Sequence, residues 1–353
     1  MKIVVLKFGG TSVADVPQIK KIALKIKLEV ELGYKVITVV SAMSGVTNNL
    51  INLVKKTSDI PPSSEYDTVL STGEQVTSAL LAIALDELKI KARSWLGWQI
   101  PIVTDNTYGK SAIEEIKTEN ILNDLEINQV AIVSGFQGVS NDNRITTLGR
   151  GGSDTTAVAM AASFLADRCD IYTDVDGVYT TDPRIVKSAK KLEIITYEEM
   201  LELASQGAKV LQTRSVALAM KYGVKLRVLS SFENLPGTSI IKEENNMEKS
   251  EISGIAHSLN EAKITLSGVP DQPGQAADIF GTLAQHSINV DMIVQSSSIN
   301  QEVTDITFTI PETDLLIAEK AIKQLQKKIS FNKFTSDTTV SYTHLTLPTI
   351  VDV

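Results

Sequence analysis

The segment Leu148–Thr156 is the part of the sequence that most constrains how this chain can fold. It contains three glycines and an arginine, and it leads directly into a helix-forming run. That run, Ala157–Ala162, predicts a helix, and Ser153 or Asp154 is its expected N-cap. The free N–H groups and the positive dipole end of such a helix attract anions, and Arg150 adds a guanidinium suited to a carboxylate or a phosphate. Asp154 supplies a carboxylate that can hold a metal or orient a cation. The segment predicts an anion-binding site, and the alternative is an ordinary glycine-rich turn beside a solvated arginine.

The composition is that of a globular protein of 353 residues, 43% hydrophobic and 22% charged, which is long enough for two domains. The net charge of −8 argues against nucleic acid or an anionic membrane as the main partner. The sequence contains no run of about 18 apolar residues, so it predicts no membrane span. The N-terminal residues predict a first strand rather than a signal peptide. The single cysteine, Cys169, excludes an internal disulfide and fits a reducing compartment. We therefore expect a cytoplasmic protein.

Short apolar runs that predict buried strands alternate with helical patterns through the first part of the chain. The predicted strands are 3–6, 36–40, 130–133, 171–172 and 226–229. This alternation predicts an α/β fold with a mostly parallel sheet covered on both faces. Ligands of such sheets bind beyond the carboxyl ends of the strands, and polar clusters follow the predicted strands here. We therefore expect the site at that edge.

The pattern changes after an acidic and amide-rich segment, 242–252, which we interpret as a linker. The elements predicted beyond it are strand 262–269, helix 276–286, strands 288–296 and 303–310, and helix 315–329. This βαββα order predicts a small ferredoxin-like module. The last stretch, Tyr342–Ile350, fits neither module.

Two loops carry groups that suit a phosphorylated ligand or its acceptor. Lys7 stands beside Gly9 and Gly10, and this loop can hold a polyphosphate, although the spacing is not that of a Walker A motif. The alternative is a surface lysine next to a turn. Ser41 and Thr47 are hydroxyls that can bind substrate, but turns and helix caps explain such residues more often.

Glu74 has two interpretations, because it opens a predicted helix. Its carboxylate can cap the helix and interact favourably with the positive end of the helix dipole, or it can bind the amine of a substrate. Capping is the better interpretation of the sequence alone. Thr173 and Asp174, at a strand end, have the character of functional residues, whereas Asp182-Pro183 fits a turn.

The positions of the histidines limit the chemistry. His257, His286 and His344 all lie beyond the linker, so the α/β region cannot use a histidine base, a Ser-His-Asp triad or a histidine-held zinc. Lysine, arginine, carboxylates, hydroxyls and glycine loops remain. That set suits phosphoryl transfer, in which positioning and charge neutralisation provide most of the catalysis.

Together these motifs resemble the aspartate kinases of the amino acid kinase family. The matching segments are Lys7–Val13, Val40–Asn48, Ser71–Glu74, Thr147–Asp154, Thr173–Arg184 and Gly207–Leu211. The region that follows resembles an ACT domain, a small-molecule sensor, through Asp271–Gly274, Asn289–Met292 and Thr304–Phe308. Several motifs in one order are far more specific than any one of them.

The resemblance implies a three-layer αβα amino acid kinase fold followed by a ferredoxin-like (βαββαβ) ACT domain. It also implies ATP-dependent phosphorylation, with Mg²⁺, of the L-aspartate side-chain carboxylate to 4-phospho-L-aspartate. This is the first step of lysine, threonine, methionine and diaminopimelate biosynthesis. Feedback inhibition by lysine or threonine and homo-oligomer formation through ACT domains are further implications. The alternatives are a glutamate or carbamate kinase of the same family, or a non-catalytic amino acid sensor.

The resemblance assigns roles residue by residue. The catalytic residues would be Lys7 and Asp154. L-Aspartate would be bound by Ser41, Thr47, Glu74, Arg150, Gly151, Gly152 and Ser153. The nucleotide would be bound by Lys7, Phe8, Gly9, Gly10, Thr173, Asp174, Tyr179, Arg184, Lys209 and Val210. An effector amino acid would be bound by Asp271, Gln295 and Thr304. No dedicated metal ligands are expected.

The expected domains are a catalytic domain at 1–241, the linker at 242–252 and an ACT domain at 253–340. The family normally carries two ACT repeats and this chain shows one, so we expect a truncated C-terminus. Ser341–Leu345 resembles the translation of a sequencing-library adapter. We therefore expect 341–353 to be a non-native tail.

Overall fold

The computed structural model describes residues 2–208, 210–242, 254–286, 288–297, 303–326 and 329–346. These residues form two compact units: the second comprises Ala256–His344, and the first comprises the described residues on either side of it. Apart from Lys242, the predicted linker lies outside the described residues. Residues 347–353 of the predicted tail also lie outside them.

The first unit is built around an eight-stranded sheet in the order β10-β12-β11-β9-β1-β2-β6-β3. Six strands run parallel to one another: β1 Ile3–Phe8, β2 Lys35–Val40, β3 Ala92–Trp95, β6 Val130–Ser134, β9 Arg168–Thr173 and β11 Leu226–Ser230. At one edge, β12 (Thr238–Ile241) runs antiparallel to β11, and β10 (Ile194–Thr196) runs parallel to β12. The mostly parallel α/β sheet expected from the sequence is confirmed.

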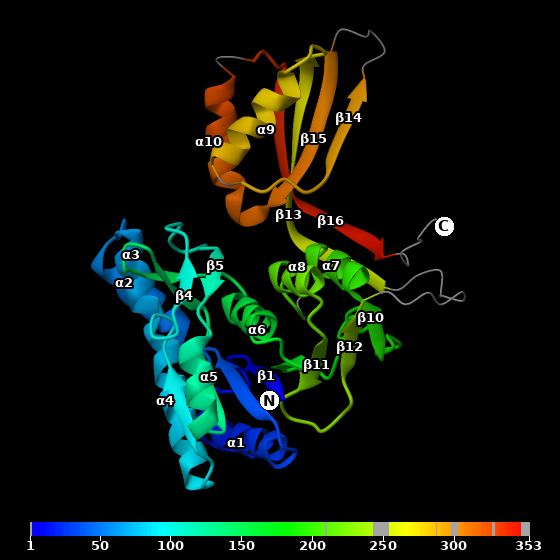
Figure 1. Ribbon diagram of the computed structural model, residues 1–353. Coiled ribbons are helices and arrows are strands. Elements are labelled where there is room, and N and C mark those ends of the chain that lie inside the picture. The colour runs from blue at the N-terminus through cyan, green and yellow to red at the C-terminus, as the bar shows by residue number, and fades with distance from the viewer. Residues whose placement is uncertain are drawn as a thin grey trace. The chain divides into compact units, whose positions relative to one another are not determined.

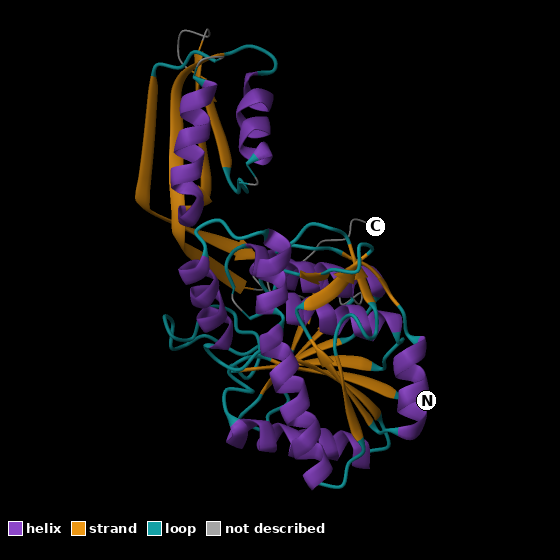
Figure 2. Cartoon of the chain, turned by 90° about the vertical axis from the view of Figure 1, so that its left-hand side faces the viewer, coloured by secondary structure: helices purple, strands orange, loops and turns teal. Residues whose placement is uncertain are grey.

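Helices cover both faces of this sheet (Figures 1 and 2). On one face, Leu6 and Phe8 of β1 pack in one core cluster with apolar residues of α1 (Val16–Glu31) and α4 (Thr72–Glu87). Because side chains alternate along a strand, Lys7 points to the other face, where α6 (Gly152–Ser163) lies. The other helices of this unit are α2 Val46–Thr57, α3 Ser63–Leu70, α5 Glu119–Ile127, α7 Tyr197–Ser205 and α8 Thr213–Tyr222.

A second, smaller sheet in this unit has the order β5-β4-β7-β8. Its strands are β4 Ile102–Thr104, β5 Ile113–Ile116, β7 Gln137–Ser140 and β8 Ile145–Thr147. The sequence did not predict these strands, because runs of three or four residues show too little periodicity to be recognised. The strand β8 leads directly into the segment that contains Arg150.

Two helix starts differ from expectation. The N-cap of α6 is Gly151, with φ 69°, so Ser153 and Asp154 lie inside the first turn instead of capping it. The left-handed conformation of Gly151 starts the helix without a side-chain cap. The helical pattern of residues 210–221 predicts a helix from Val210, but helix α8 begins at Thr213, after the N-cap Gln212.

The second unit has the element order β13 (Gly254–Pro270), α9 (Gln275–Gln285), β14 (Ile293–Ser297), β15 (Val303–Pro311), α10 (Leu315–Leu325) and β16 (Lys333–Thr346), with a short 3-10 turn at Glu312–Asp314. Its sheet has the order β14-β15-β13-β16, with both helices on the same side (Figure 1). This arrangement confirms the ferredoxin-like module. Strand β14 begins at Ile293 rather than at residue 288 as predicted. Ile288 packs in the hydrophobic core of this unit but does not pair with the sheet. Strand β16 continues through Thr346, so the described part of the stretch that fitted neither module, Tyr342–Thr346, extends this strand.

The segment Ser63–Glu87 is long and apolar enough by composition to cross a membrane, but half of its most apolar window is buried inside the protein. It comprises α3 and α4, and its buried carboxylates Asp67 and Glu74 both accept hydrogen bonds. The segment therefore has the properties of core helices.

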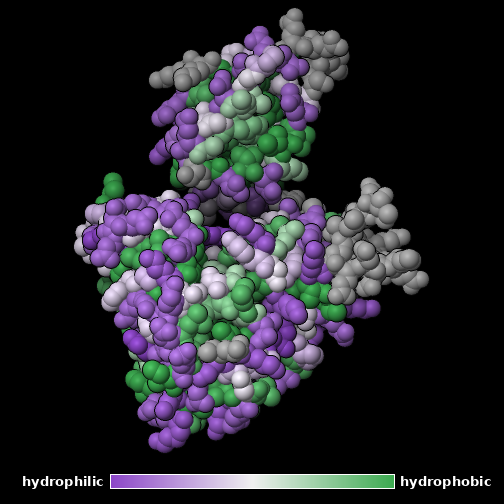
Figure 3. Space-filling view, in the orientation of Figure 1, coloured by the Kyte–Doolittle hydropathy of each residue, from purple (hydrophilic) through white to green (hydrophobic). Residues whose placement is uncertain are grey.

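Hydrophilic and hydrophobic residues are intermixed on the face of the molecule seen in Figure 3.

Candidate active site

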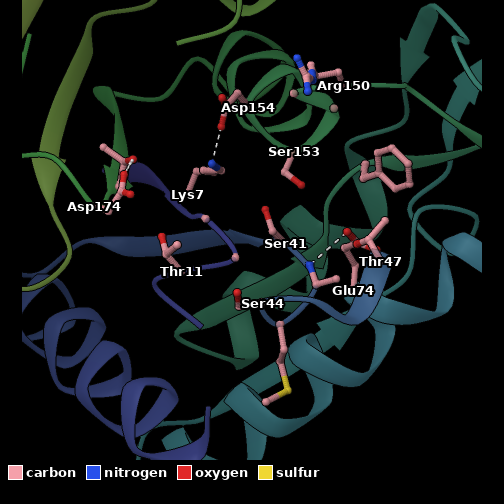
Figure 4. Close-up of a pocket in the computed structure, with 18 of the residues that line it drawn as sticks. Lys7, Thr11, Ser41, Ser44, Thr47, Glu74, Arg150, Ser153, Asp154 and Asp174 are labelled. Atoms are coloured by element: carbon pink, nitrogen blue, oxygen red, sulfur yellow. Dashed lines mark hydrogen bonds and ion pairs between the residues drawn. The ribbon is translucent and has the colours of Figure 1, made fainter. Parts of the chain in front are cut away.

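A cavity of about 490 Å³ opens where β1, β2 and β9 end and the loops that lead into α2, α4 and α6 converge (Figure 4). It gathers most of the site residues predicted from the sequence. Those lining it are Lys7, Gly9, Gly10, Ser41, Thr47, Glu74, Arg150, Gly151, Gly152, Ser153, Asp154, Thr173 and Asp174. The segments that bear them are far apart in the sequence and are brought together by the fold.

An ion pair between Lys7 and Asp154 lies against this cavity. Lys7 Nζ is 2.5 Å from Asp154 Oδ1, and each side chain is only 10% exposed. Lys7 lies within β1 instead of the following loop, so it is a buried strand residue and not a surface lysine. Its ammonium is therefore held at a fixed position where a phosphate could be neutralised.

The glycine segment before α6 brings backbone close to the cavity. Gly149 and Gly151 both have positive φ, 76° and 69°. A Cβ on Gly151 would also lie 1.9 Å from the Cγ of Gln212. A glycine at position 151 therefore allows the segment to turn sharply beneath α8 and direct the N-terminus of α6 at the cavity.

Glu74 is buried in the first turn of α4 and contacts another segment. Its Oε1 accepts a hydrogen bond of 3.0 Å from the amide of Ala42, in the turn after β2. A Cβ on Gly73 would lie 2.7 Å from the Cβ of Ala42, so a glycine there permits this close approach. The carboxylate therefore links the start of α4 to the turn after β2, and its negative charge also interacts favourably with the positive end of the α4 dipole.

The second oxygen of Glu74, Oε2, is buried without a hydrogen-bond partner among the residues that the structure describes. Burial raises the pKa of Glu74 to about 7, against the opposing hydrogen bonds from the amides of Ala42 and of Glu74 itself. A buried acceptor without a partner is costly. The atom is therefore suited to a cationic group of a ligand.

Some lining residues were missed by the sequence analysis. These are Thr11, Ala42, Met43, Ser44, Gly45, Phe136 and Gly149. All except Phe136 belong to the matching motifs quoted above, so motif membership was a usable signal. Phe136 lies in a turn with φ 70° after β6, so its position just after the predicted strand 130–133 was the signal that the sequence offered for it.

Four described residues proposed for the nucleotide do not line this cavity. Phe8 lies in the core and stacks on Tyr172 with ring centroids 4.7 Å apart. Tyr179 donates a hydrogen bond to Asp176, and Arg184 pairs with Asp182 while its side chain is 81% exposed. The other described residue is Val210, which is half-buried, and Lys209 lies outside the described residues.

The candidates for an effector site lie in the second unit. Asp271 and Gln295 are exposed, and Thr304 is buried. The hydroxyl of Thr304 donates a hydrogen bond to the carbonyl of Ser296 in the neighbouring strand.

A second hollow in the first unit has a different lining, with Trp95, Trp98 and Arg93 among its residues. The guanidinium of Arg93 lies 4.0 Å from the ring centroid of Trp95. This hollow has neither a glycine loop nor a lysine. The cavity at the carboxyl ends of the strands is therefore the candidate active site.

Comparison with known proteins agrees with this geometry. Residues 2–230 match the model of the amino acid kinase family, and residues 264–329 match the ACT domain. The chain is 50% identical over 342 residues to an aspartate kinase of Pseudomonas putida, covering 97% of this chain and 83% of that protein. It is 50% identical over 343 residues to an aspartokinase of Pseudomonas aeruginosa, with the same coverage.

Solved structures show the same similarity. The crystal structure of Escherichia coli aspartokinase III in complex with aspartate and ADP, in the R-state, has a TM-score of 0.82 and 27% identity over 98% of this chain and 87% of that chain. The T-state structure of that protein with lysine and aspartate has a TM-score of 0.76.

Proposed function

Because the chain belongs to the amino acid kinase family, we propose that its cavity transfers the γ-phosphoryl group of ATP to the side-chain carboxylate of L-aspartate. The two Pseudomonas relatives are aspartate kinases that are 50% identical to this chain over 97% of its length. This similarity confirms the resemblance seen in the motifs. The chain is an aspartate kinase with an ACT domain. A glutamate or carbamate kinase and a non-catalytic sensor are not favoured. The product, 4-phospho-L-aspartate, begins the biosynthesis of lysine, threonine, methionine and diaminopimelate.

The reaction needs an oriented nucleophile and charge neutralisation. The β-carboxylate of aspartate is ionised at neutral pH, since its ordinary pKa is about 4, so no general base is required. One of its oxygens forms a bond to the γ-phosphorus as the bond from that phosphorus to the β,γ-bridging oxygen breaks, and ADP leaves. Lys7 would stabilise the charge on the transferring group. Asp154 would hold the Lys7 ammonium in place.

Aspartate would be held by charges at opposite sides of the cavity. Glu74 Oε2, the buried oxygen without a partner in the described structure, would accept a hydrogen bond from the substrate ammonium. Arg150 would bind a substrate carboxylate through its guanidinium fork. The remaining binding groups would be Ser41, Thr47, Gly151, Gly152 and Ser153, which all line the cavity.

The nucleotide would enter from the β1 and β9 side. Gly9 and Gly10 would allow backbone amides to approach the phosphates, and Thr173 and Asp174 line the same side. The other residues proposed for the nucleotide are Phe8, Tyr179, Arg184, Lys209 and Val210.

Mg²⁺ would arrive with ATP, held by phosphates, water and one or two carboxylates. Asp154 and Asp174 are the carboxylates that fit this role in the cavity, besides the buried Glu74. When bound, the ion would neutralise phosphate charge.

Regulation would act through the second unit. The Escherichia coli relative was crystallised with lysine in its T-state, and we propose lysine and threonine as inhibitors of this chain. Asp271, Gln295 and Thr304 would contribute to the effector site. A homo-oligomer formed through ACT domains and a cytoplasmic location complete the proposal.

The observation that carries the proposal is the buried Lys7–Asp154 pair facing Glu74 across one cavity. The test is an assay of ADP release and acyl-phosphate formation with ATP and each of L-aspartate, L-glutamate and carbamate. Turnover with aspartate alone supports the proposal. Turnover with another acid identifies a different kinase, and amino acid binding without turnover with any acid identifies a sensor.

A further inference from the structure

The segment that carries Arg150 is held from two sides by side chains that do not line the cavity. Arg150 itself is exposed, and its side chain makes no hydrogen bond or ion pair within the described part of the chain. Its direction therefore depends on the backbone of the three residues before it, Thr147, Leu148 and Gly149. Two side chains, Asp67 and Arg214, bind to this backbone.

Asp67 of α3 holds the end of β8. It is fully buried, and its Oδ2 accepts hydrogen bonds from the amides of Thr147, at 2.7 Å, and Gly109, at 2.9 Å. Its Oδ1 accepts from the hydroxyl of Thr147 at 2.8 Å. Burial raises the pKa of Asp67, and these three hydrogen bonds oppose that rise. A buried carboxylate that accepts three hydrogen bonds fixes the backbone at Thr147.

Arg214 of α8 holds the next residue from the other side. Its Nη1 donates to the carbonyl of Leu148 at 3.0 Å, and its Nη2 donates to the carbonyl of Ser111 at 2.8 Å. The amide of Ser111 in turn donates to the carbonyl of Thr147 at 3.0 Å. The contacts of Asp67 and Arg214 therefore meet on one short piece of backbone.

We infer that Asp67 and Arg214 are positioning residues, which direct Arg150 at the substrate carboxylate by fixing the backbone before it. The inference rests on the role of Arg150 in the proposed function. Asp67 is too deeply buried to touch a ligand, and neither residue lines the cavity. A displacement of about 1 Å in a binding group can cost roughly a hundredfold in rate. The two residues therefore matter for aspartate even though they do not contact it.

The test uses two conservative variants and a matched control. Asp67→Asn keeps the shape but presents an NH₂ group where an oxygen accepts from backbone. Arg214→Lys keeps the charge but loses the fork that reaches two carbonyls. The control is Glu65→Gln, which removes an exposed ion pair between the same helix, α3, and Arg144 next to β8.

Each positioning variant should raise the KM for aspartate by about tenfold or more, while the KM for ATP changes by less than about threefold. Glu65→Gln should leave both constants within about twofold of the original. If Asp67→Asn does not fold, as judged by circular dichroism, Arg214→Lys alone decides the outcome. Equal rises in both KM values, or no rise, would overturn the inference.

A double-mutant cycle with Arg150→Ala separates a positioning role from a structural one. If the two residues act through Arg150, their effect on the KM for aspartate disappears once Arg150 is alanine. An effect that persists in that background would show that they act elsewhere. An unchanged KM in Arg150→Ala itself would refute the role of Arg150, and the inference with it. A large Arg150→Ala effect without any effect of the two variants refutes the inference alone.

Discussion

Glu74 and Ala42 join the first turn of α4 to the turn after β2, because Glu74 Oε1 accepts a hydrogen bond from the amide of Ala42 at 3.0 Å. One carboxylate oxygen is thereby used by the protein, and Oε2 stays buried without a partner in the described structure. Gly73 lets the two backbones approach. This arrangement separates a structural oxygen from one that is available to a substrate.

Glu74→Gln should raise the KM for aspartate far more than the KM for ATP. The amide can still accept from Ala42, so the fold should be retained, but its charge-assisted bond to the substrate ammonium is lost. Such a bond is worth about 1.5–3 kcal/mol, or roughly 10- to 150-fold. Steady-state kinetics with each substrate varied in turn measure this. Equal effects on both KM values would assign Glu74 to its structural contact alone.

The KM for aspartate should fall as pH rises from about 6 to about 8, because only ionised Glu74 attracts the ammonium and its pKa is about 7. Raising the pH should therefore strengthen aspartate binding, whereas it should destabilise the fold of the free protein. The folded state binds a proton that the unfolded state releases, so the free energy of unfolding falls as pH rises between the ordinary pKa of Glu74 and about 7. Glu74→Gln should flatten the part of both profiles that Glu74 contributes. A profile of kcat/KM for aspartate that is unchanged in this variant would contradict the assignment.

Lys7 and Asp154 should be coupled in stability. Asp154→Leu leaves a buried ammonium without its partner and should lower the free energy of unfolding by about 3–5 kcal/mol. The double variant Lys7→Met with Asp154→Leu should recover much of that loss while remaining inactive. Urea unfolding of the two single variants and the double variant measures the coupling. Additive losses would show that the ion pair does not hold these side chains.

Gly151→Ala should lower both stability and the affinity for aspartate. The positive φ alone costs about 1–2 kcal/mol for a residue with a Cβ, and the new atom would overlap Gln212. Gly33→Ala is the matched control, because Gly33 also has positive φ, 87°, but a Cβ there meets nothing within 4 Å. Gly151→Ala should therefore be the more destabilising variant in thermal unfolding. Equal shifts in the two variants would show that the segment adjusts around the overlap.

The sequence predicted the major strands because each is a short apolar run buried on both faces, as in β1 and β2. It could not predict the second sheet, whose strands are too short to show a pattern. It interpreted Lys7 as part of a loop, since only pairing with Val39 and Ile171 reveals that β1 extends past it. The clustering of Lys7, Glu74 and Arg150 follows from the parallel sheet and was expected at its carboxyl edge. The contacts of Asp67 and Arg214 join segments distant in sequence, so only the folded structure reveals them.

The central claim is that this cavity phosphorylates aspartate with Lys7 as the charge-neutralising group. The most direct measurement is hydroxylamine trapping of the acyl phosphate formed from ATP and L-aspartate, compared among the original chain, Lys7→Met and Lys20→Met. Lys20 forms an exposed ion pair with Glu87 and is a matched lysine outside the cavity. We predict aspartyl hydroxamate from the original chain and from Lys20→Met, and a loss of about a hundredfold or more in Lys7→Met. Aspartyl hydroxamate formed by Lys7→Met within a few-fold of the original rate would contradict this account.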